Sequence, residues 1–597
     1  MPRPHNAQEL IHWLEMGRGA RWIRLTATFL ALLTFSLFVA WKQFHGLTTE
    51  STLVQADVGR QLAAGKGFTT LVNYPQAAAF LRQKGLSFDA QQPYPELYQA
   101  PLYSIVVAGA LRVLPVSWRD SLFAKSPVPP DGFRADYFLL GLNLVLLWLT
   151  AWLTWVLGTR LFDSRVGWVS ALALLVSVGI WQQTVVANGA PLLMLLVVVA
   201  FWIWARAETE IELASRASLG SLAGLGAASG LLFLTEYSAG ALLVVAVVYF
   251  GIRCTGAQRW RSVGLLLLGF LLVASPWVAR NVALTGHPVA LASQNLALKA
   301  GDPTAEPATE RRSFSAKLLE ADLNKVANKT LTRAQESLKE RIWSGGAMWL
   351  AGFFAAGWLY TFRSNLANRL RWAFTASLAV LILTQAIFNS GESERLAAGW
   401  LAPVIIIFGA GFFSVLLGSN PVLGAWPKLC ITGLLVLQGL PLLHDALEPR
   451  RLHFQYPPYF PGLFIGMRLE LEARDTVGRF GLMADVPAGV AWYGQHRVWA
   501  QPLRLRDFYA ITLEQPIGEL LLTPSTLDRP FFSELAARPV EPNALGRITD
   551  RFGDWGQIYA GLLTGRLPAE FPLNAPQKLA ENLYVMLNPA LPPAPGK

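Results

Sequence analysis

Four carboxylates in segment 43–100 are best suited by type and spacing to acid–base chemistry: Glu50, Asp57, Asp89 and Glu96. Glu50 and Asp57 are seven residues apart, so on a continuous helix they share one face. Two carboxylates placed in this way can serve as a general base and its partner. Solvated loop charges explain the same residues, and residue chemistry alone favours that simpler interpretation.

A second candidate cluster lies near the C-terminus and combines aromatic with basic side chains, namely Trp492, Tyr493, His496, Arg497 and Trp499. Such side chains commonly bind sugars or phosphates. Core packing with a surface arginine accounts for them equally well. The two cysteines, Cys254 and Cys430, fall in or beside apolar runs and indicate neither a disulfide framework nor a metal site.

The elements that must position these residues are membrane helices. Only 15% of the residues are charged, 53% are hydrophobic, and the mean hydropathy is +0.37. Apolar runs near the roughly 20 residues that a helix needs to cross a bilayer occur at 23–41, 136–157, 166–182, 190–205, 217–235, 238–252, 262–279, 344–362, 370–388, 397–417 and 425–443. Because the backbone of each run must close its hydrogen bonds internally, we expect helices. The first run is longer than a typical signal core and no small-residue cleavage site follows it, so it is expected to remain as a span.

Arginines in the short turns predict the orientation. The N-terminus and the turns near 160–165, 206–216, 253–261 and 363–371 are basic, whereas the turns at 183–189, 235–237 and 389–396 are poor in basic residues. When the basic turns are placed on the cytoplasmic side, the N-terminus lies in the cytoplasm and three long segments lie outside, namely 43–135, 280–343 and 444–597. The net charge of +11 is therefore mainly a topology signal and does not indicate nucleic-acid binding.

The apolar stretch 101–115 would reverse every later turn if it crossed the membrane. As a helix it reaches only about 22 Å, which is short of the hydrocarbon thickness. We expect a short or re-entrant helix in the outer half of the membrane. The alternative is a true crossing, with one neighbouring pair forming a single broken helix.

The outer segments have predicted elements of their own. In the first, helical spacing ends at Gly65, and a second short helix is expected around 76–83. The second should carry a charged amphipathic helix over 313–341, with Leu318, Leu319, Leu323 and Val326 on one side. That helix could close over a cleft at the interface or act as a peripheral strut. For 444–597 we expect a small α/β domain with helices at 466–474 and 530–537 and strands at 479–484, 489–493 and 518–522.

Several motifs in chain order carry a resemblance to a known family. After the first span, residues 59–68 read Gly-Arg-Gln-Leu-Ala-Ala-Gly-Lys-Gly-Phe, close to an A-R-x-L-A-x-G-x-G-F/Y pattern. The later motifs are Ala100-Pro101-Leu102-Tyr103, Leu234-Thr235-Glu236-Tyr237-Ser238, Pro276-Trp277-Val278-Ala279-Arg280-Asn281, the segment from Arg395 to Pro403, and residues 485–494, DVPAGVAWYG. Taken together, the chain resembles bacterial membrane glycosyltransferases of the GT-C superfamily, nearest to the protein-mannosyltransferase-like and aminoarabinose-transferase-like branch. The oligosaccharyltransferase signature W-W-D-x-G is absent.

The resemblance implies an all-α polytopic membrane domain of about 11–12 helices at 1–443 and a soluble extracytoplasmic α/β domain at 444–597. It also implies transfer of a monosaccharide from a polyprenyl-phosphate donor, with inversion, to a glycan, lipid or protein acceptor outside a bacterial cytoplasmic membrane. A first-loop carboxylate would act as base, Glu50 in our interpretation, with Asp57 binding the acceptor or supporting the base. Arg280 and Arg395 are the candidates to bind the donor phosphate, because a guanidinium matches phosphate oxygens; interfacial anchoring is the simpler role for both.

The chain departs from the family pattern at positions close to the residues expected to take part in the reaction. Relatives often place Asp-Glu or Glu-x-x-Asp just after the first span, whereas this chain has Glu50 with Asp57 displaced along the helix. Asn188 stands where relatives often have an acid, and Glu236 where they often have arginine or lysine. Together with these two, the residues expected to contact substrate are Arg60, Tyr103 and His287.

No cofactor is required by the sequence, although the family leaves room for a divalent cation; His287 stands alone and no ligand cluster is evident. Two other functions remain open. A catalytically degenerate relative could bind lipid-linked sugar or scaffold an envelope complex. A transporter or flippase is the third class, but the chain lacks a repeated pair of Gly/Pro-broken spans.

Overall fold

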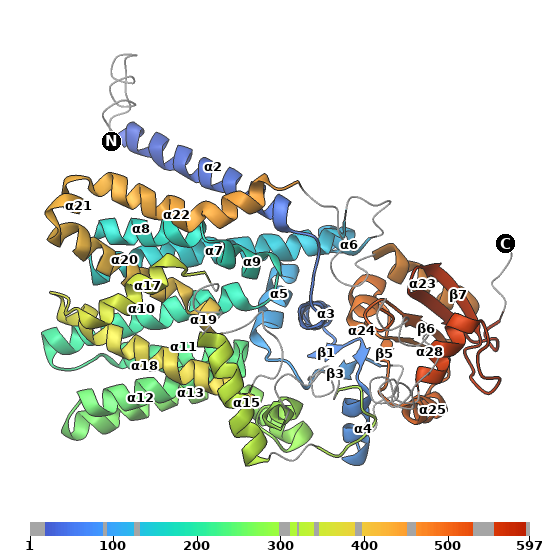
Figure 1. The fold of residues 1–597 in the computed structure, drawn as a ribbon. Coiled ribbons are helices and arrows are strands. Elements are labelled where there is room, and N and C mark those ends of the chain that lie inside the picture. The colour runs from blue at the N-terminus through green and yellow to red at the C-terminus, as the bar shows by residue number, and fades with distance from the viewer. Residues whose placement is uncertain are drawn as a thin grey trace, which may run out of the picture.

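The protein consists of a long bundle of helices and a smaller strand-containing domain at one end of it (Figure 1). The computed structural model describes residues 18–86, 92–124, 132–297, 311–318, 322–338, 346–388, 397–449, 461–528 and 555–592. Within these residues, seven helices are long and apolar enough to cross a membrane: α2 (Arg18–Gln43), α7 (Arg134–Leu161), α10 (Ala190–Ala214), α13 (Gly256–Thr285), α18 (Asn365–Phe388), α20 (Ala402–Ser419) and α22 (Pro427–Leu447). The protein is therefore a multi-pass membrane protein.

The other predicted runs form shorter or bent helices. The run at 166–182 becomes α8 (Ser164–Leu175) and α9 (Val178–Val185), which meet at a bend of 55° and together are long enough for an eighth span. The remaining three runs correspond to α11 (Leu219–Thr235), to η1 (Tyr237–Ala241) with α12 (Leu242–Arg253), and to α17 (Trp349–Ala356) with η5 (Gly357–Leu359). Two short helices, α19 (Ala397–Trp400) and α21 (Pro421–Ala425), precede α20 and α22.

The stretch 101–115 forms a short helix, as predicted. α5 (Leu102–Val113) has 12 residues and so rises only about 18 Å. It packs against α3 (Glu50–Ala63) of the first outer loop. At their contact a Cβ on Gly59 would lie 2.7 Å from Val107 Cγ1. The glycine at position 59 therefore permits this close approach.

The remaining helices of the first loop also follow the sequence signals. Thr49 caps α3 by accepting a hydrogen bond from the Thr52 N–H, and Gly65 ends the helix with a positive φ of 78°. The second expected helix is α4 (Pro75–Gln83), with proline in its first turn. α6 (Val116–Phe123) follows α5 and leads toward α7.

The strand-containing domain is built around a six-stranded sheet with the order β2-β5-β4-β6-β8-β7. Its C-terminal strands are β4 (Gly481–Ala484), β5 (Val498–Ala500), β6 (Ile517–Leu522), β7 (Ala575–Ala580) and β8 (Leu583–Leu587). β2 (Val72–Asn73) comes from the first outer loop and pairs in parallel with β5, Val72 opposite Val498. β1 (Thr69–Thr70) and β3 (Tyr94–Pro95) form a separate antiparallel pair. The first loop and the C-terminal segment thus share one sheet.

Helices cover this sheet: α23 (Pro461–Arg474), α25 (Leu505–Glu514) and α28 (Trp555–Thr564). The predicted strands at 479–484 and 518–522 are confirmed, but the strand at 489–493 is wrong. That segment forms α24 (Pro487–Gly489) and the π-helical turn η7 (Val490–Gly494), because Pro487 favours a helix start. The predicted helix at 530–537 lies outside the described residues. The boundary predicted at 443/444 falls within α22.

The second outer segment differs from its prediction at the start of its helix. η2 (Ala290–Leu296) follows α13, and α15 spans Leu323–Glu336, whereas the prediction began at 313. Residues 313–318 are not helical, and Asp322 caps α15 by accepting from the Asn324 N–H. Leu323, expected on the apolar side of this helix, is 85% exposed.

Candidate functional site

Helix α3 carries both carboxylates that the sequence singled out, but it gives them different surroundings. Glu50 is the first residue of the helix, and its side chain is 21% exposed. The Tyr74 hydroxyl donates a 2.7 Å hydrogen bond to Glu50 Oε1, and Arg312 Nη2 lies 3.9 Å from Oε2. A carboxylate with one neutral donor, one distant cation and access to solvent can accept a proton from a substrate hydroxyl.

Asp57 lies two turns further along and is fully buried. Its Oδ1 accepts a 2.6 Å bond from Arg60 Nη2. Its Oδ2 accepts from the Thr70 hydroxyl at 2.9 Å and from the Leu71 N–H at 2.7 Å. These contacts fix α3 to the chain that enters β2, so the geometry gives Asp57 a structural role.

Arg60 extends this connection to the C-terminal domain. Its guanidinium donates to the carbonyls of Ala491 (2.7 Å) and Trp492 (3.0 Å) in η7. It also lies over the rings of Phe123 and Trp492, about equally close to each at 5.4 and 5.3 Å. All of these contacts of Arg60 are with protein groups, so Arg60 connects α3 with the C-terminal domain.

Around Glu50 the fold assembles a group that we name the aromatic–arginine cluster: Glu50, Tyr74, Glu96, Tyr98, Arg311 and Arg312. The Arg311 guanidinium lies 4.6 Å from the Tyr98 ring centre and 5.6 Å from that of Tyr74, at a distance typical of cation–π contacts. The two tyrosine rings meet edge to face at 5.4 Å. Burial, followed by the Glu50 carboxylate, raises the pKa of Tyr74 well above its ordinary value.

Glu96 is the buried acid of this cluster. Its Oε1 accepts from the N–H groups of Tyr98 (2.7 Å) and Gln99 (3.0 Å). Burial raises the pKa of Glu96, while the nearby Arg311 acts in the opposite direction. Its backbone carbonyl takes part in the site as well, through Arg280.

Arg280 reaches this region from α13, four residues after Pro276. Its Nη2 donates to the carbonyls of Phe68 (3.3 Å) and Glu96 (3.1 Å), and Nη1 donates to Asn281 Oδ1 at 3.1 Å. The guanidinium lies 4.5 Å from the Trp277 ring centre. Among the described residues these hydrogen-bond partners are all neutral, and the Glu96 carboxylate acts on the guanidinium only from beyond ion-pair distance. Arg280 therefore forms no direct ion pair with a described residue.

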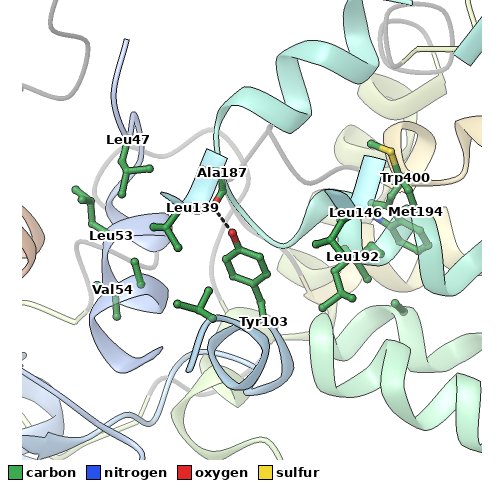
Figure 2. Close-up of a cluster of buried hydrophobic side chains, with 14 of the residues drawn as sticks. Leu47, Leu53, Val54, Tyr103, Leu139, Leu146, Ala187, Leu192, Met194 and Trp400 are labelled. Atoms are coloured by element: carbon green, nitrogen blue, oxygen red, sulfur yellow. Dashed lines mark hydrogen bonds between the residues drawn. The ribbon is translucent and has the colours of Figure 1, made fainter. Parts of the chain in front are cut away.

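Two other predicted substrate contacts lie in the core. The buried Tyr103 hydroxyl donates to the Ala187 carbonyl at 2.6 Å, and Figure 2 shows its ring among apolar side chains such as Leu139 and Val54. Asn188 is 1% exposed, and its Oδ1 accepts from the Ala190 N–H at 2.9 Å, where α10 begins. Both residues join α5, α7 and α10, so their contacts are those of packing residues.

Of the last three predicted residues, Glu236 and His287 are not brought into the cluster by the contacts described. Glu236 follows α11 and closes it through its N–H, which donates to Leu232. His287 stands in the turn after α13, where its N–H donates to the Thr285 hydroxyl at 3.2 Å. Arg395 lies outside the described residues.

The aromatic and basic C-terminal residues are packing residues, which was the simpler of the two interpretations. Trp492 Nε1 and the Tyr493 hydroxyl both donate to the buried Asp136 carboxylate at the start of α7, at 2.8 and 3.0 Å. Trp499 is 1% exposed and donates to Gln515. His496 is partly buried and contacts the Arg497 carbonyl. Trp492 and Tyr493 therefore dock the domain on the helical bundle.

Sequence reasoning missed Tyr74, Tyr98, Arg311 and Arg312. The adjacent pair Arg311-Arg312 in the segment 280–343 was a visible signal, since two neighbouring arginines often bind carboxylates or phosphates. The tyrosines had no such signal. For metals, no group of three or more His, Cys, Asp or Glu side chains comes together in the part of the chain that is described.

No family model matches the sequence, and no curated protein is significantly similar to it. Solved structures do match. The oligosaccharyltransferase of Archaeoglobus fulgidus in complex with Zn and sulfate has a TM-score of 0.52 and 11% identity, over 86% of this chain and 70% of that chain. The same enzyme tethered to an acceptor peptide with the NVT sequon gives 0.50 and 11%, over 89% and 72%. ArnT from Cupriavidus metallidurans bound to undecaprenyl phosphate gives 0.49 and 12%, over 95% and 98%.

At this level of identity the oligosaccharyltransferase matches establish the fold and nothing further. They cover 86% and 89% of the present chain. The resemblance found in the sequence motifs is thereby confirmed for the architecture: the chain has the fold of GT-C membrane glycosyltransferases.

Proposed function

We propose that this protein transfers a monosaccharide from a polyprenyl-phosphate donor to an acceptor hydroxyl on the outer side of a bacterial cytoplasmic membrane. The observation that carries the proposal is the difference between the two carboxylates of α3. Glu50 is partly exposed, and among the described residues no close hydrogen bond reaches its Oε2, whereas Asp57 is buried among three donors. Glu50 is therefore the base.

The reaction proceeds as follows. Glu50 accepts the proton of the acceptor hydroxyl, whose oxygen forms a bond to the anomeric carbon. The bond from that carbon to the phosphate oxygen breaks, with inversion, and the lipid phosphate leaves with the electron pair. Arg280 lies beside the cluster, and no described carboxylate lies within ion-pair distance of its guanidinium. The planar fork of the guanidinium suits phosphate oxygens.

Transfer of one sugar is favoured over transfer of a preassembled glycan because the W-W-D-x-G signature is absent from the sequence. The outward orientation rests on the arginine-rich turns. It is supported by the position of the first loop and the strand-containing domain at the same end of the bundle, away from the N-terminus (Figure 1). A fusion of alkaline phosphatase to the C-terminus should be active if this orientation holds.

The test of function is Glu50→Gln in protein reconstituted with radiolabelled polyprenyl-phosphate sugars and cell-envelope acceptors. Loss of a general base lowers the rate by about 10²–10⁴, so transfer should nearly cease while donor binding remains. The matched control is Glu472→Gln, because Glu472 is an exposed acid of α23 that lies outside the aromatic–arginine cluster. Wild-type rates for Glu50→Gln would place the base elsewhere. Donor binding without transfer by the wild type would favour a degenerate sugar-binding protein.

A further inference from the structure

Helix α15 exposes two leucines while its lysine Lys329 is buried, the reverse of what is usual for a helix on a soluble protein. Leu323 is 85% exposed and Leu331 61% exposed, and Ala327 between them is exposed as well. Their spacing of four residues places them on one face of the helix. Leu338, just beyond the helix, is 53% exposed and lies on the continuation of this face. We name Leu323, Ala327, Leu331 and Leu338 the leucine face.

The opposite side of α15 packs on the protein through polar groups. Lys329 is 2% exposed, and its Nζ donates to the carbonyls of Asn295 and Leu296 at the end of η2, the second at 3.1 Å. Ser337, eight residues on, is 4% exposed. Since lysine is rarely buried without a partner, these bonds fix which side of α15 faces inward. The leucine face must therefore point away from the protein.

The place of α15 in the fold indicates what covers this face. η2 follows the C-terminal end of α13, and α15 packs against α18, running across the ends of these membrane helices in Figure 1. The exposed apolar surface of α13 extends through Leu271 and Leu272 to Val282, three residues before that end. Because the protein is a multi-pass membrane protein, such surface contacts lipid. α15, which carries the leucine face, packs on α18, another of the helices long and apolar enough to cross a membrane.

We propose that α15 lies in the plane of the outer membrane surface with its leucine face inserted among lipid chains. This arrangement is typical of interfacial amphipathic helices. The charged pair of Lys325 and Asp322, about half exposed, stays at the aqueous side. The proposal concerns lipid binding by this surface and does not depend on the transfer reaction.

A series of hydrogen bonds also connects α15 with the aromatic–arginine cluster. η2, which receives the Lys329 bonds, donates from the Leu291 N–H to the Leu97 carbonyl at 3.0 Å. Gln294 of η2 accepts a 2.9 Å bond from Gln76, whose N–H donates to the Arg311 carbonyl. The membrane surface therefore supports the segment that holds Arg311 in the cluster.

The experiment is a spin-label scan of the full-length protein in liposomes, with Cys430→Ser to remove the more accessible native thiol. Labels at Leu331 and Leu323 should collide more with oxygen, which concentrates in lipid, than with a water-soluble nickel chelate. Labels at Thr332 and Lys325, which are exposed on the flank of α15 away from the leucine face, should show the opposite preference. The two leucine positions are independent, so failure of one variant to fold leaves the other.

Two results would overturn the proposal. Nickel accessibility at 331 and 323 equal to that at 332 would place the leucine face in water. Protection of both positions from oxygen and nickel alike would show that a protein surface covers it.

Discussion

Replacing Asp57 with asparagine should destabilise the protein much more than replacing Glu50 with glutamine. The Asp57 carboxylate pairs with the buried Arg60, whose side chain is 12% exposed, and also accepts from Thr70 and Leu71. An amide has one acceptor oxygen, so if that oxygen serves Thr70 and Leu71, the NH₂ group faces the guanidinium. Burial already lowers the pKa of Arg60, and Asp57 is what opposes that effect.

The magnitude follows from the loss of one partner of a buried ion pair, which costs about 3–5 kcal/mol. Because Arg60 keeps two carbonyl acceptors in η7, the lower end, about 3 kcal/mol, is expected. For a unit of 150–250 residues this corresponds to a fall of about 6–12 °C in melting temperature. Glu50→Gln should cost less than about 1 kcal/mol, since an amide oxygen still accepts from Tyr74 and the Arg312 contact is long and partly exposed.

The assay is thermal unfolding of the purified protein in detergent, followed by tryptophan fluorescence, alongside transfer activity. The double variant Asp57→Asn with Arg60→Met removes the unpaired charge and should recover part of the lost stability. A wild-type melting temperature for Asp57→Asn combined with loss of transfer would refute this reasoning and make Asp57 the base.

Three further predictions concern the domain contact, the phosphate site and pH. Asp136→Asn should cost about 1–3 kcal/mol, because one of the donors Trp492 and Tyr493 loses its acceptor, and limited proteolysis between the bundle and the domain should become faster. Arg280→Ala should abolish donor use, and Arg280→Lys should restore it only in part, since lysine keeps the charge but not the planar fork. The measurement is KM for the donor, and normal donor use by both variants would remove Arg280 from the site. Burial raises the pKa of Glu519 to about 8 from an ordinary 4.5. The stability that the protonated carboxyl contributes is therefore full below pH 4.5 and is lost as pH rises through 8. In Glu519→Gln the melting temperature should change less between pH 6 and 9 than in the wild type, and an unchanged profile would contradict this.

The membrane architecture and the helices of the first loop could be predicted because their signals are local. Apolar length marks the spans, and proline and glycine mark the ends of α3 and α4. The same reasoning failed at 489–493, because periodicity alone does not distinguish a short buried strand from a buried helical turn. It also began the helix of α15 about ten residues early, because charged and apolar residues alternate at helical spacing before the Asp322 cap.

The candidate site could be predicted from the sequence only at residues whose side-chain type itself indicates a chemical role. Glu50 and Arg280 were identified from type and position along the chain, and both reach the aromatic–arginine cluster. Tyr74 and Arg312 contact Glu50 from 24 and 262 residues further along. Partners brought together across such separations leave no spacing to detect. For the same reason nothing in the two residues of β2 indicated that they join a sheet formed more than 400 residues later.

The displaced acid of the first loop now has a physical account. Asp57 binds the Leu71 N–H immediately before β2, β2 pairs with β5, and Arg60 binds η7 of the same domain. α3 is thereby held along its length by the domain that follows the last span. In the proposed reaction, Glu50 as the base needs no second carboxylate to orient it, because the backbone of α3 is fixed and Tyr74 holds the Glu50 side chain. Asp57 therefore does not leave the site short of an acid; it fixes the helix that presents Glu50, and a protein with Asp57 intact but Glu50 neutralised should remain folded while unable to deprotonate an acceptor.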